Sequence, residues 1–248
     1  MNCDLYCEDN LVTLNRLETE SIDLIYCDVL YGTGKKFVDY VDLQPNRQTI
    51  FDFYNVRLIE MFRVLKNTGT IYLQCDIRIN HWLRMMMDDI FGYENFRNEI
   101  VVKYNIGGYG KTEFAKKHDY LIVYSKSNQY TFNTDKIRIP YKSVISKSTN
   151  RPNITPEKLA IGTVPTNVWD DIPNGLKVKK KTDYFSEKHE KLLERIILAS
   201  SNETDLVADF FLGSGTTVAV CQRLNRNFVG CDINPRSIQI TKQRLCLN

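Results

Sequence analysis

Short apolar runs along the chain alternate with segments whose apolar residues recur at helical spacing. The runs at 21–27 and 69–75 are rich in β-branched and aromatic residues, which is typical of buried strands. Between them, residues 49–69 place apolar side chains three and four positions apart and end in a glycine. This pattern predicts a strand, a helix and a second strand, the unit from which parallel sheets are built.

The alternation continues on both sides of a less regular segment. A second helix is predicted at 80–91, and residues 205–245 again alternate strands with helices. The sequence therefore predicts an α/β fold with a doubly wound, mostly parallel sheet. We expect residues 1–96 and 184–248 to form this domain, and residues 97–183 to be an insertion of two or three strands and long loops.

Positive charge is concentrated in the predicted insertion. Residues 97–183 hold sixteen Lys/Arg against eight Asp/Glu, so the remainder is net negative although the whole chain carries +3. Lysine and arginine neutralise phosphates and dominate the affinity of proteins for nucleic acids. The charge split fits a nucleic-acid contact in this segment, and it fits a solvated surface equally well.

Length and composition are those of a globular protein, with 248 residues and 43% hydrophobic side chains. No apolar stretch approaches the roughly 20 residues that span a bilayer, and the first residues lack the features of a secretory signal. The seven cysteines are odd in number and lack zinc-site spacing, which favours reduced thiols and no metal site. We expect a cytoplasmic protein without membrane contact.

The motif DLVADFFLGSGTTVAV, at 205–220, joins a predicted strand to a helix through a Gly-Ser-Gly turn. Glycines let the backbone approach a ligand, and the N–H groups at a helix start favour an anionic group. Asp232 ends the next predicted strand, 17 residues beyond Gly215, where a carboxylate can accept both hydroxyls of a ribose. Val218 replaces the third glycine of a dinucleotide fingerprint, so the pattern favours a mononucleoside.

Together, the motifs resemble those of the β class of S-adenosylmethionine-dependent DNA amino-methyltransferases, in that family's order. DVLY at 28–31 corresponds to the catalytic tetrapeptide, usually DPPY, and precedes the basic segment. YFSEKHEKLLERIILAS, from 184, resembles the segment that usually reads YPTQKPxxLLERII, and FLGSGTT, from 211, resembles the cofactor loop. The resemblance covers nearly the whole chain. It implies a Rossmann-like methyltransferase fold with a target-recognition region, S-adenosyl-L-methionine as cofactor and double-stranded DNA as substrate.

The resemblance also implies a set of cofactor-binding residues, carried over position by position. They are Asp9, Asp28, Ser186, Glu187, Lys188, Asp209, Phe211, Gly213, Ser214, Gly215, Thr216, Thr217 and Asp232. Asp232 would bind the ribose, Asp9 would lie at the adenine end, and residues 186–188 would approach the methionine end. Asp9 has a structural alternative as a helix cap, and Glu187 and Lys188 have one as ordinary residues of a first helical turn.

The same resemblance assigns Asp28 and Tyr31 to catalysis. The amino group of adenine is a poor nucleophile, and a carboxylate with the backbone carbonyl after it can accept both amino hydrogens. A flipped-out base would stack on Tyr31, which offsets part of the cost of flipping. Val29 and Leu30 replace the family's two prolines, which keeps both carbonyls but adds N–H groups and backbone freedom. A catalytically weakened DNA-binding homologue is therefore an alternative.

Lysines, aromatic residues and glycines are mixed in KYNIGGYGKTEFAKKHDY, at 103–120, which suits phosphate contacts and filling of the gap left by a flipped base. The predicted nucleic-acid-binding residues are Lys103, Tyr109, Lys111, Lys116 and Lys117. Asp28 resembles the pattern of adenine-N6 enzymes, whereas cytosine-N4 relatives more often carry Ser. The first hypothesis is therefore adenine-N6 methylation in a restriction-modification system, and the second is cytosine-N4 methylation. A cognate restriction endonuclease and a homodimer are open alternatives for its partners.

Overall fold

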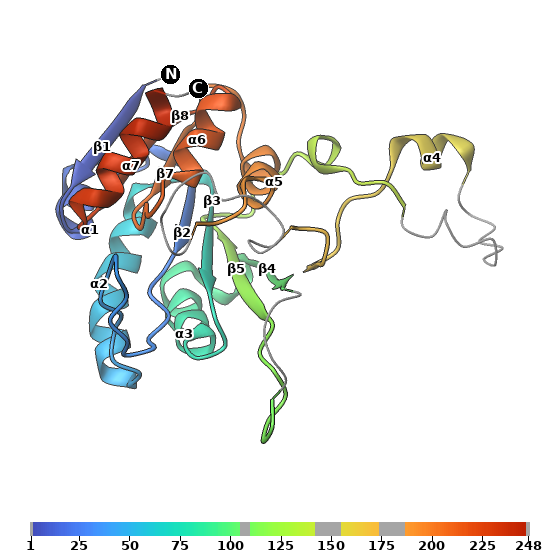
Figure 1. Cartoon of the computed structure of the whole chain (residues 1–248). Helices are drawn as coiled ribbons and strands as arrows, with labels where there is room; N and C mark the ends of the chain where they lie inside the picture. The colour runs from blue at the N-terminus through green and yellow to red at the C-terminus, as the bar shows by residue number, and fades with distance from the viewer. Residues whose placement is uncertain (1, 105–109, 142–154, 174–186, 247–248) are drawn as a thin grey trace.

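The computed structural model describes residues 2–104, 110–141, 155–173 and 187–246 (Figure 1). Among these residues, eight strands form one sheet in the order β1-β8-β7-β2-β3-β5-β4-β6. The strands are β1 (Cys3–Cys7), β2 (Ile22–Asp28), β3 (Leu65–Cys75), β4 (Phe96–Lys103), β5 (His118–Ser125), β6 (Val168–Trp169), β7 (Leu206–Asp209) and β8 (Asn227–Asp232). Neighbouring strands from β1 to β3 pair in parallel, β5 is antiparallel to β3 and β4, and β6 is parallel to β4.

Helices cover both faces of this sheet (Figure 1). On one face lie α1 (Asn10–Arg16), α2 (Arg47–Val64) and α3 (Asn80–Phe91), and on the other lie α5 (Glu190–Ser200), α6 (Thr216–Arg223) and α7 (Pro235–Cys246). The first layer packs Tyr54 and Leu83 against Leu73, and the second packs Ile196 with Tyr72. Each helix layer buries the apolar side chains of one sheet face, so the core has two halves.

In the described part of the chain, three short helices lie outside these layers, namely η1 (Tyr93–Asn95), η2 (Thr134–Ile137) and α4 (Pro156–Ile161). None of the described helices is both long enough and apolar enough to cross a bilayer.

The predicted doubly wound, mostly parallel α/β fold is confirmed. The helix predicted at 80–91 is α3, and it is followed by Gly92 with a φ of 85°, a conformation that favours glycine. The predicted insertion contributes the strands β5 and β6 and nearly all of β4 to the main sheet. β4 and β5 extend the main sheet, because β5 pairs with β3 from Thr70 to Cys75.

The pairing of β2 with β7 determines where the candidate site lies in the fold. Leu24 lies beside Val207, and the chain leaves β2 toward α2 on one face and β7 toward α6 on the other. Loops that leave adjacent parallel strands in opposite directions open a crevice at the carboxyl ends of those strands. Asp28 and Asp209 are the last residues of these two strands.

Candidate active site

A cavity of about 490 Å³ opens at the carboxyl ends of β2, β7 and β8. This volume is in the range of small-molecule sites. Most predicted cofactor and catalytic residues line it, namely Asp9, Asp28, Tyr31, Lys188, Asp209, Phe211, Gly213, Ser214, Thr216, Thr217 and Asp232. Gly215 and Glu187 are not among its lining residues, and Ser186 lies outside the described residues.

The glycine turn after β7 is required by its backbone and its packing. Gly213 and Gly215 have φ values of 53° and 72°, in the left-handed region that favours glycine. A Cβ on Gly215 would lie 2.4 Å from Oγ1 of Thr241 on α7, so this glycine lets α6 and α7 approach each other. The N–H of Gly213 donates to Oδ2 of Asp232 at 2.8 Å, which joins the turn to the end of β8.

Two acids, the buried Asp209 and the half-buried Asp232, hold the glycine turn. Asp209 is 2% exposed, and its carboxylate accepts from Oγ1 of Thr217 at 2.6 Å and from the N–H of Phe211 at 3.0 Å. Burial outweighs these hydrogen bonds and raises the pKa of Asp209 to about 7. Burial also raises the pKa of Asp232, whose second oxygen accepts from the N–H of Asn234. Hydrogen bonds from Gly213, Asn234 and Ser237 hold this carboxylate, and Asp232 also lines the cavity.

Asp9 has the capping role that the sequence offered as an alternative, and it also lines the cavity. Its Oδ1 accepts from the N–H of Leu11 at 2.8 Å, which caps α1. Its Oδ2 forms an ion pair with Arg57 of α2 at 2.8 Å, and Arg57 also donates to the side chain of Asn10. Arg57 thus fixes the start of α1 beside the cavity.

Asp28, Tyr31 and Lys188 form one polar cluster at the end of β2. The Tyr31 hydroxyl lies 2.8 Å from Oδ1 of Asp28, and Nζ of Lys188 lies 3.0 Å from the same oxygen. Lys188 Nζ is also 3.1 Å from the Tyr31 hydroxyl and 5.4 Å from the centre of its ring. Within the described part of the chain, the hydrogen bond and the ion pair of the Asp28 carboxylate both use Oδ1, so Oδ2 is left for a substrate donor.

Burial and charge act against each other in this cluster. Burial raises the pKa of Asp28, Lys188 opposes that shift, and a second carboxylate, Asp119, adds to it. For Lys188, burial alone lowers the pKa, but Asp28 and Asp119 reverse this and raise it above the usual value. Lys188 is therefore a stable ammonium between two acids.

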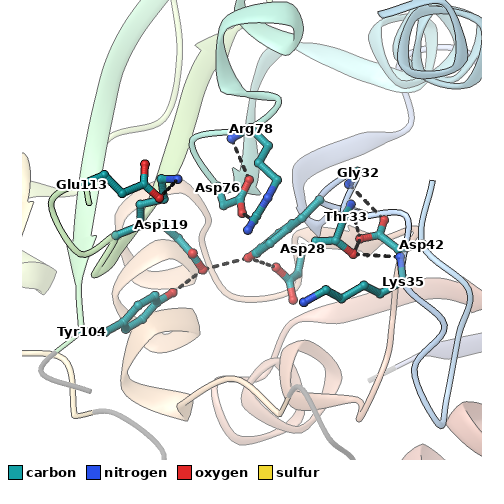
Figure 2. Close-up of polar contacts among 12 residues, drawn as sticks. Asp28, Gly32, Thr33, Lys35, Asp42, Asp76, Arg78, Tyr104, Glu113 and Asp119 are labelled. Atoms are coloured by element: carbon teal, nitrogen blue, oxygen red, sulfur yellow. Dashed lines mark hydrogen bonds and ion pairs between the residues drawn. The ribbon is translucent and has the colours of Figure 1, made fainter. Parts of the chain in front are cut away.

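Asp119 of β5 and Gln74 were not predicted from the sequence, and Tyr104 was expected only among the aromatic residues of the basic segment. Figure 2 shows Asp119 and Tyr104 turned toward each other on the side of the cluster away from the Gly32 turn. The Asp119 carboxylate accepts from Nε2 of Gln74 at 2.8 Å and lies 2.8 Å from the Tyr31 hydroxyl. One signal was present in the sequence, because an acid inside the apolar run HDYLIVYS is unusual unless it is paired.

Val29 and Leu30, which stand where the family has prolines, are held by hydrogen bonds. The N–H of Val29 donates to the carbonyl of Gln74 at 3.1 Å and thereby extends the pairing of β2 with β3. The hydroxyl of Tyr54 donates to the carbonyl of Leu30 at 2.7 Å. The N–H group that valine adds is thus used, and it restricts the backbone where proline would have done so.

The segment after Tyr31 folds back over the cavity. Asp42, 4% exposed, accepts from the N–H groups of Gly32 at 3.0 Å and Thr33 at 2.8 Å, as Figure 2 shows. Asp39 forms an ion pair with Arg236 of α7 at 2.9 Å, which ties the segment to the opposite wall. The cavity-lining residues of this segment are Tyr40, Val41 and Leu43.

Glu187 lies three residues before α5, outside the first helical turn that the sequence offered as its structural alternative. Its Oε1 pairs with Arg244 of α7 at 3.0 Å, and Arg244 also pairs with Glu190 at 2.9 Å. Glu190 is the first residue of α5 and Glu187 precedes the helix, so Arg244 joins this part of the chain to α7. Lys188, between them in the chain, points instead toward Asp28.

The predicted nucleic-acid residues lie on and after β4 and before β5, and Tyr109 is outside the described residues. Lys103, Lys111 and Lys116 are exposed, and Lys117 is half-buried. Lys116 pairs with Glu113 at 2.8 Å. The Phe114 side chain is 98% exposed, which places an unshielded aromatic ring among these lysines.

The chain belongs to the DNA methylase family, whose model matches residues 22–243. It is 35% identical over 247 residues to the type II methyltransferase M.HpaI of Haemophilus parainfluenzae, a match that covers 99% of this chain and 74% of the relative. It is 31% identical over 241 residues to the DNA adenine methyltransferase YhdJ of Escherichia coli K12, with 96% and 80% covered. The resemblance inferred from the motifs is confirmed.

Solved structures share the fold. The cytosine-N4-specific PvuII DNA methyltransferase aligns with a TM-score of 0.70 at 18% identity, covering 98% of this chain and 86% of its own. The complex of M1.HpyAVI with S-adenosylmethionine aligns with a TM-score of 0.62 at 18% identity, covering 98% and 99%. These structures represent enzymes of one fold, and they include a cytosine-N4 enzyme.

Replacing Val29 by proline should destabilise the protein, because the buried carbonyl of Gln74 then loses its donor. We expect Val29→Pro to lower the free energy of unfolding by about 1–3 kcal/mol in urea titrations. Leu30→Pro is the matched control, since it introduces the same ring one residue later and keeps this hydrogen bond. Equal stability of the two proline variants would contradict the role assigned to the Val29 N–H.

Asp209→Asn should change how stability depends on pH. The pKa of about 7 in the folded protein exceeds the unfolded value of about 3.9, so the stability that Asp209 contributes when protonated is lost as pH rises through 7. Relative to the variant, the wild type should lose about 3 kcal/mol of unfolding free energy between about pH 5 and pH 8. Urea unfolding of both proteins at these pH values measures the difference. Parallel pH profiles would refute the raised pKa.

Proposed function

We propose that this DNA methylase transfers a methyl group from S-adenosyl-L-methionine to the N6 amino group of adenine in double-stranded DNA. The observation that carries the proposal is the meeting of Asp28 and Tyr31 with the glycine turn in one cavity. S-adenosyl-L-methionine is the cofactor that the family implies, and M1.HpyAVI was solved in complex with it.

The cavity fits this cofactor in chemistry and in size. Its 490 Å³ are lined by carboxylates and by apolar side chains, among them Asp232 and Phe211. The carboxylate of Asp232 would accept the ribose hydroxyls, as in other α/β nucleoside sites. The acids of the cavity, Asp28 and Asp209, suit a ligand that carries a positive charge. When bound, S-adenosyl-L-methionine supplies an electrophilic methyl group.

Asp28 and Tyr31 would prepare the base. Oδ2 of Asp28 and a carbonyl of the 29–30 segment would accept the amino hydrogens, which directs the nitrogen lone pair toward the methyl donor. The carbonyl of Leu30 already accepts from Tyr54, so the carbonyl of Val29 is the better candidate. The ring of Tyr31 is fixed at its hydroxyl and offers the stacking surface. Transfer would release one proton from the nitrogen, and Asp28 is placed to take it.

Adenine is favoured over cytosine by two observations. Asp28 resembles the adenine-N6 pattern, and the relative at 31% identity is named a DNA adenine methyltransferase. The second candidate is cytosine-N4 methylation, which the PvuII enzyme carries out on the same fold.

The basic segment supports a DNA interface. Of its exposed lysines, Lys103 is the last residue of β4, and Lys111 and Lys116 lie between β4 and β5. Residues 97–183 would then include the target-recognition region, and residues 1–96 with 184–248 would supply the cofactor site together with Asp28 and Tyr31. A cognate restriction endonuclease and a homodimer remain proposals, as does a cytoplasmic location.

Methyl transfer is tested by incubating the protein with labelled cofactor and unmethylated DNA and digesting the product to nucleosides. We expect label in N6-methyladenine, and a loss of about 10²- to 10⁴-fold in Asp28→Asn with cofactor affinity retained. Asp23→Asn is the control, because Asp23 lies at the other end of β2 and pairs with Lys66. Label in N4-methylcytosine would select the second candidate. DNA and cofactor binding without transfer to any base would instead indicate a weakened homologue.

The DNA interface is tested by the salt dependence of binding. Replacing Lys103, Lys111 and Lys116 together by alanine should weaken binding and lower the slope of log K against log salt by about 0.9 for each phosphate that the variant no longer neutralises. Lys242→Ala, which removes an exposed lysine from α7, is the control. An unchanged slope in the triple variant would exclude these lysines from the interface.

A further inference from the structure

Asp119 is a buried acid that touches the catalytic cluster but does not line the cavity. It is 7% exposed and comes from β5, a strand antiparallel to β3. A single oxygen, Oδ2, lies 2.8 Å from the hydroxyl of Tyr31 and 3.5 Å from Nζ of Lys188. Asp119 therefore contacts Tyr31 and Lys188, which are the two residues that contact Asp28.

Further donors fix Asp119 itself. Nε2 of Gln74 donates to Oδ2 at 2.8 Å, and the hydroxyl of Tyr104 donates to the same oxygen. The amide of Gln74 is oriented in turn, because its oxygen accepts from Tyr26 at 2.7 Å. A buried carboxylate with this many donors is held in one position. Asp119 is thus a rigid acceptor behind Tyr31.

Lys188 is shared between two acids. Its Nζ lies 3.0 Å from Asp28 and 3.5 Å from Asp119. A second carboxylate divides the hydrogen bonds of the ammonium, so less of its positive charge is directed at Asp28. Without Asp119, Lys188 would pair with Asp28 alone, and Asp28 would become a weaker acceptor for amino hydrogens.

We propose that Asp119 is a positioning residue for methyl transfer, which holds the Tyr31 hydroxyl and Lys188 so that Oδ2 of Asp28 faces the base. The proposal rests on the methyltransferase function proposed above. Asp119 acts through Tyr31 and Lys188, and it touches neither the base nor the methyl donor. The alternative is a purely structural acid that satisfies Gln74 and Tyr104.

A double-mutant cycle separates these two roles. Asp119→Asn retains an acceptor for Gln74 and Tyr104, and Tyr31→Phe retains the stacking ring but removes the hydroxyl. We expect each to lower kcat by about 10- to 100-fold, with the KM for cofactor nearly unchanged. The kcat of the double variant should be about equal to that of the slower single variant. Both substitutions break the same contact, the one between the Tyr31 hydroxyl and Asp119, so their effects should not multiply. Multiplied effects in the double variant would overturn the proposal.

Asp88→Asn is the matched control. Asp88 also accepts from the hydroxyl of a β5 tyrosine, Tyr124, but it lies on α3, outside the catalytic cluster. This variant should keep the wild-type kcat. If Asp88→Asn lowered kcat as much as Asp119→Asn, the loss would reflect a general effect of removing a carboxylate that binds a tyrosine hydroxyl. That result would also overturn the proposal.

A spectroscopic measurement tests the contact between Asp119 and the Tyr31 hydroxyl independently of enzymatic activity. The chain has 14 tyrosines, and labelling their ring Cζ atoms with carbon-13 lets the Tyr31 signal be assigned by its loss in Tyr31→Phe. The signal should shift in Asp119→Asn and stay in place in Asp88→Asn. An unshifted signal would refute the contact. If Asp119→Asn does not fold, Asp119→Glu replaces it, since the added methylene displaces the carboxylate from the Tyr31 hydroxyl.

The two proposals fail in different ways. A wild-type protein that transfers no methyl group to adenine or cytosine overturns the proposed function, and the Tyr31 signal still tests the Asp119 contact. A wild-type protein that methylates DNA, with Asp119→Asn as active as wild type, overturns the positioning role alone.

Discussion

The lateral pairing of β2 with β7 is the constraint on which the site depends. Leu24 and Ile25 lie beside Val207 and Ala208 at the centre of the sheet, although about 180 residues separate the two strands in the chain. The strands are parallel and their helices cover opposite faces, so their carboxyl ends open into one crevice. The tetrapeptide that begins at Asp28 and the turn that begins at Asp209 therefore face the same cavity, and each would be an isolated strand end without this pairing.

Local patterns allowed much of the fold to be predicted. Helical spacing located α3, and the Gly-Ser-Gly turn located the start of α6, because both depend on neighbours in the sequence. Asp119, Gln74 and Tyr104 meet only through the antiparallel register of β5 with β3 and β4, which no local pattern encodes. The same register joins β4 and β5, which the sequence assigned to the inserted segment, to the main sheet.

The residues in place of the family's prolines illustrate how one geometry is reached by two routes. Proline restricts a segment through its ring, whereas Val29 restricts it by donating to Gln74 and Leu30 by accepting from Tyr54. Residue type alone suggested a more mobile segment, because the partners lie on β3 and α2. The hydrogen bond of Val29 also couples the tetrapeptide to Gln74, whose side chain holds Asp119.

The acids at this sheet edge are better explained by function than by stability. Asp28 and Asp119 share a single ammonium, that of Lys188, Asp209 ends the neighbouring strand, and burial raises the pKa of Asp28 and Asp209. A fold selected for stability alone would not bury more carboxylates than cations, because each unpaired charge costs several kcal/mol. Clusters of this kind are found where perturbed groups serve chemistry. An excess of negative charge is also the complement that a cationic methyl donor requires, so the cluster that destabilises the protein is the one that suits the cofactor.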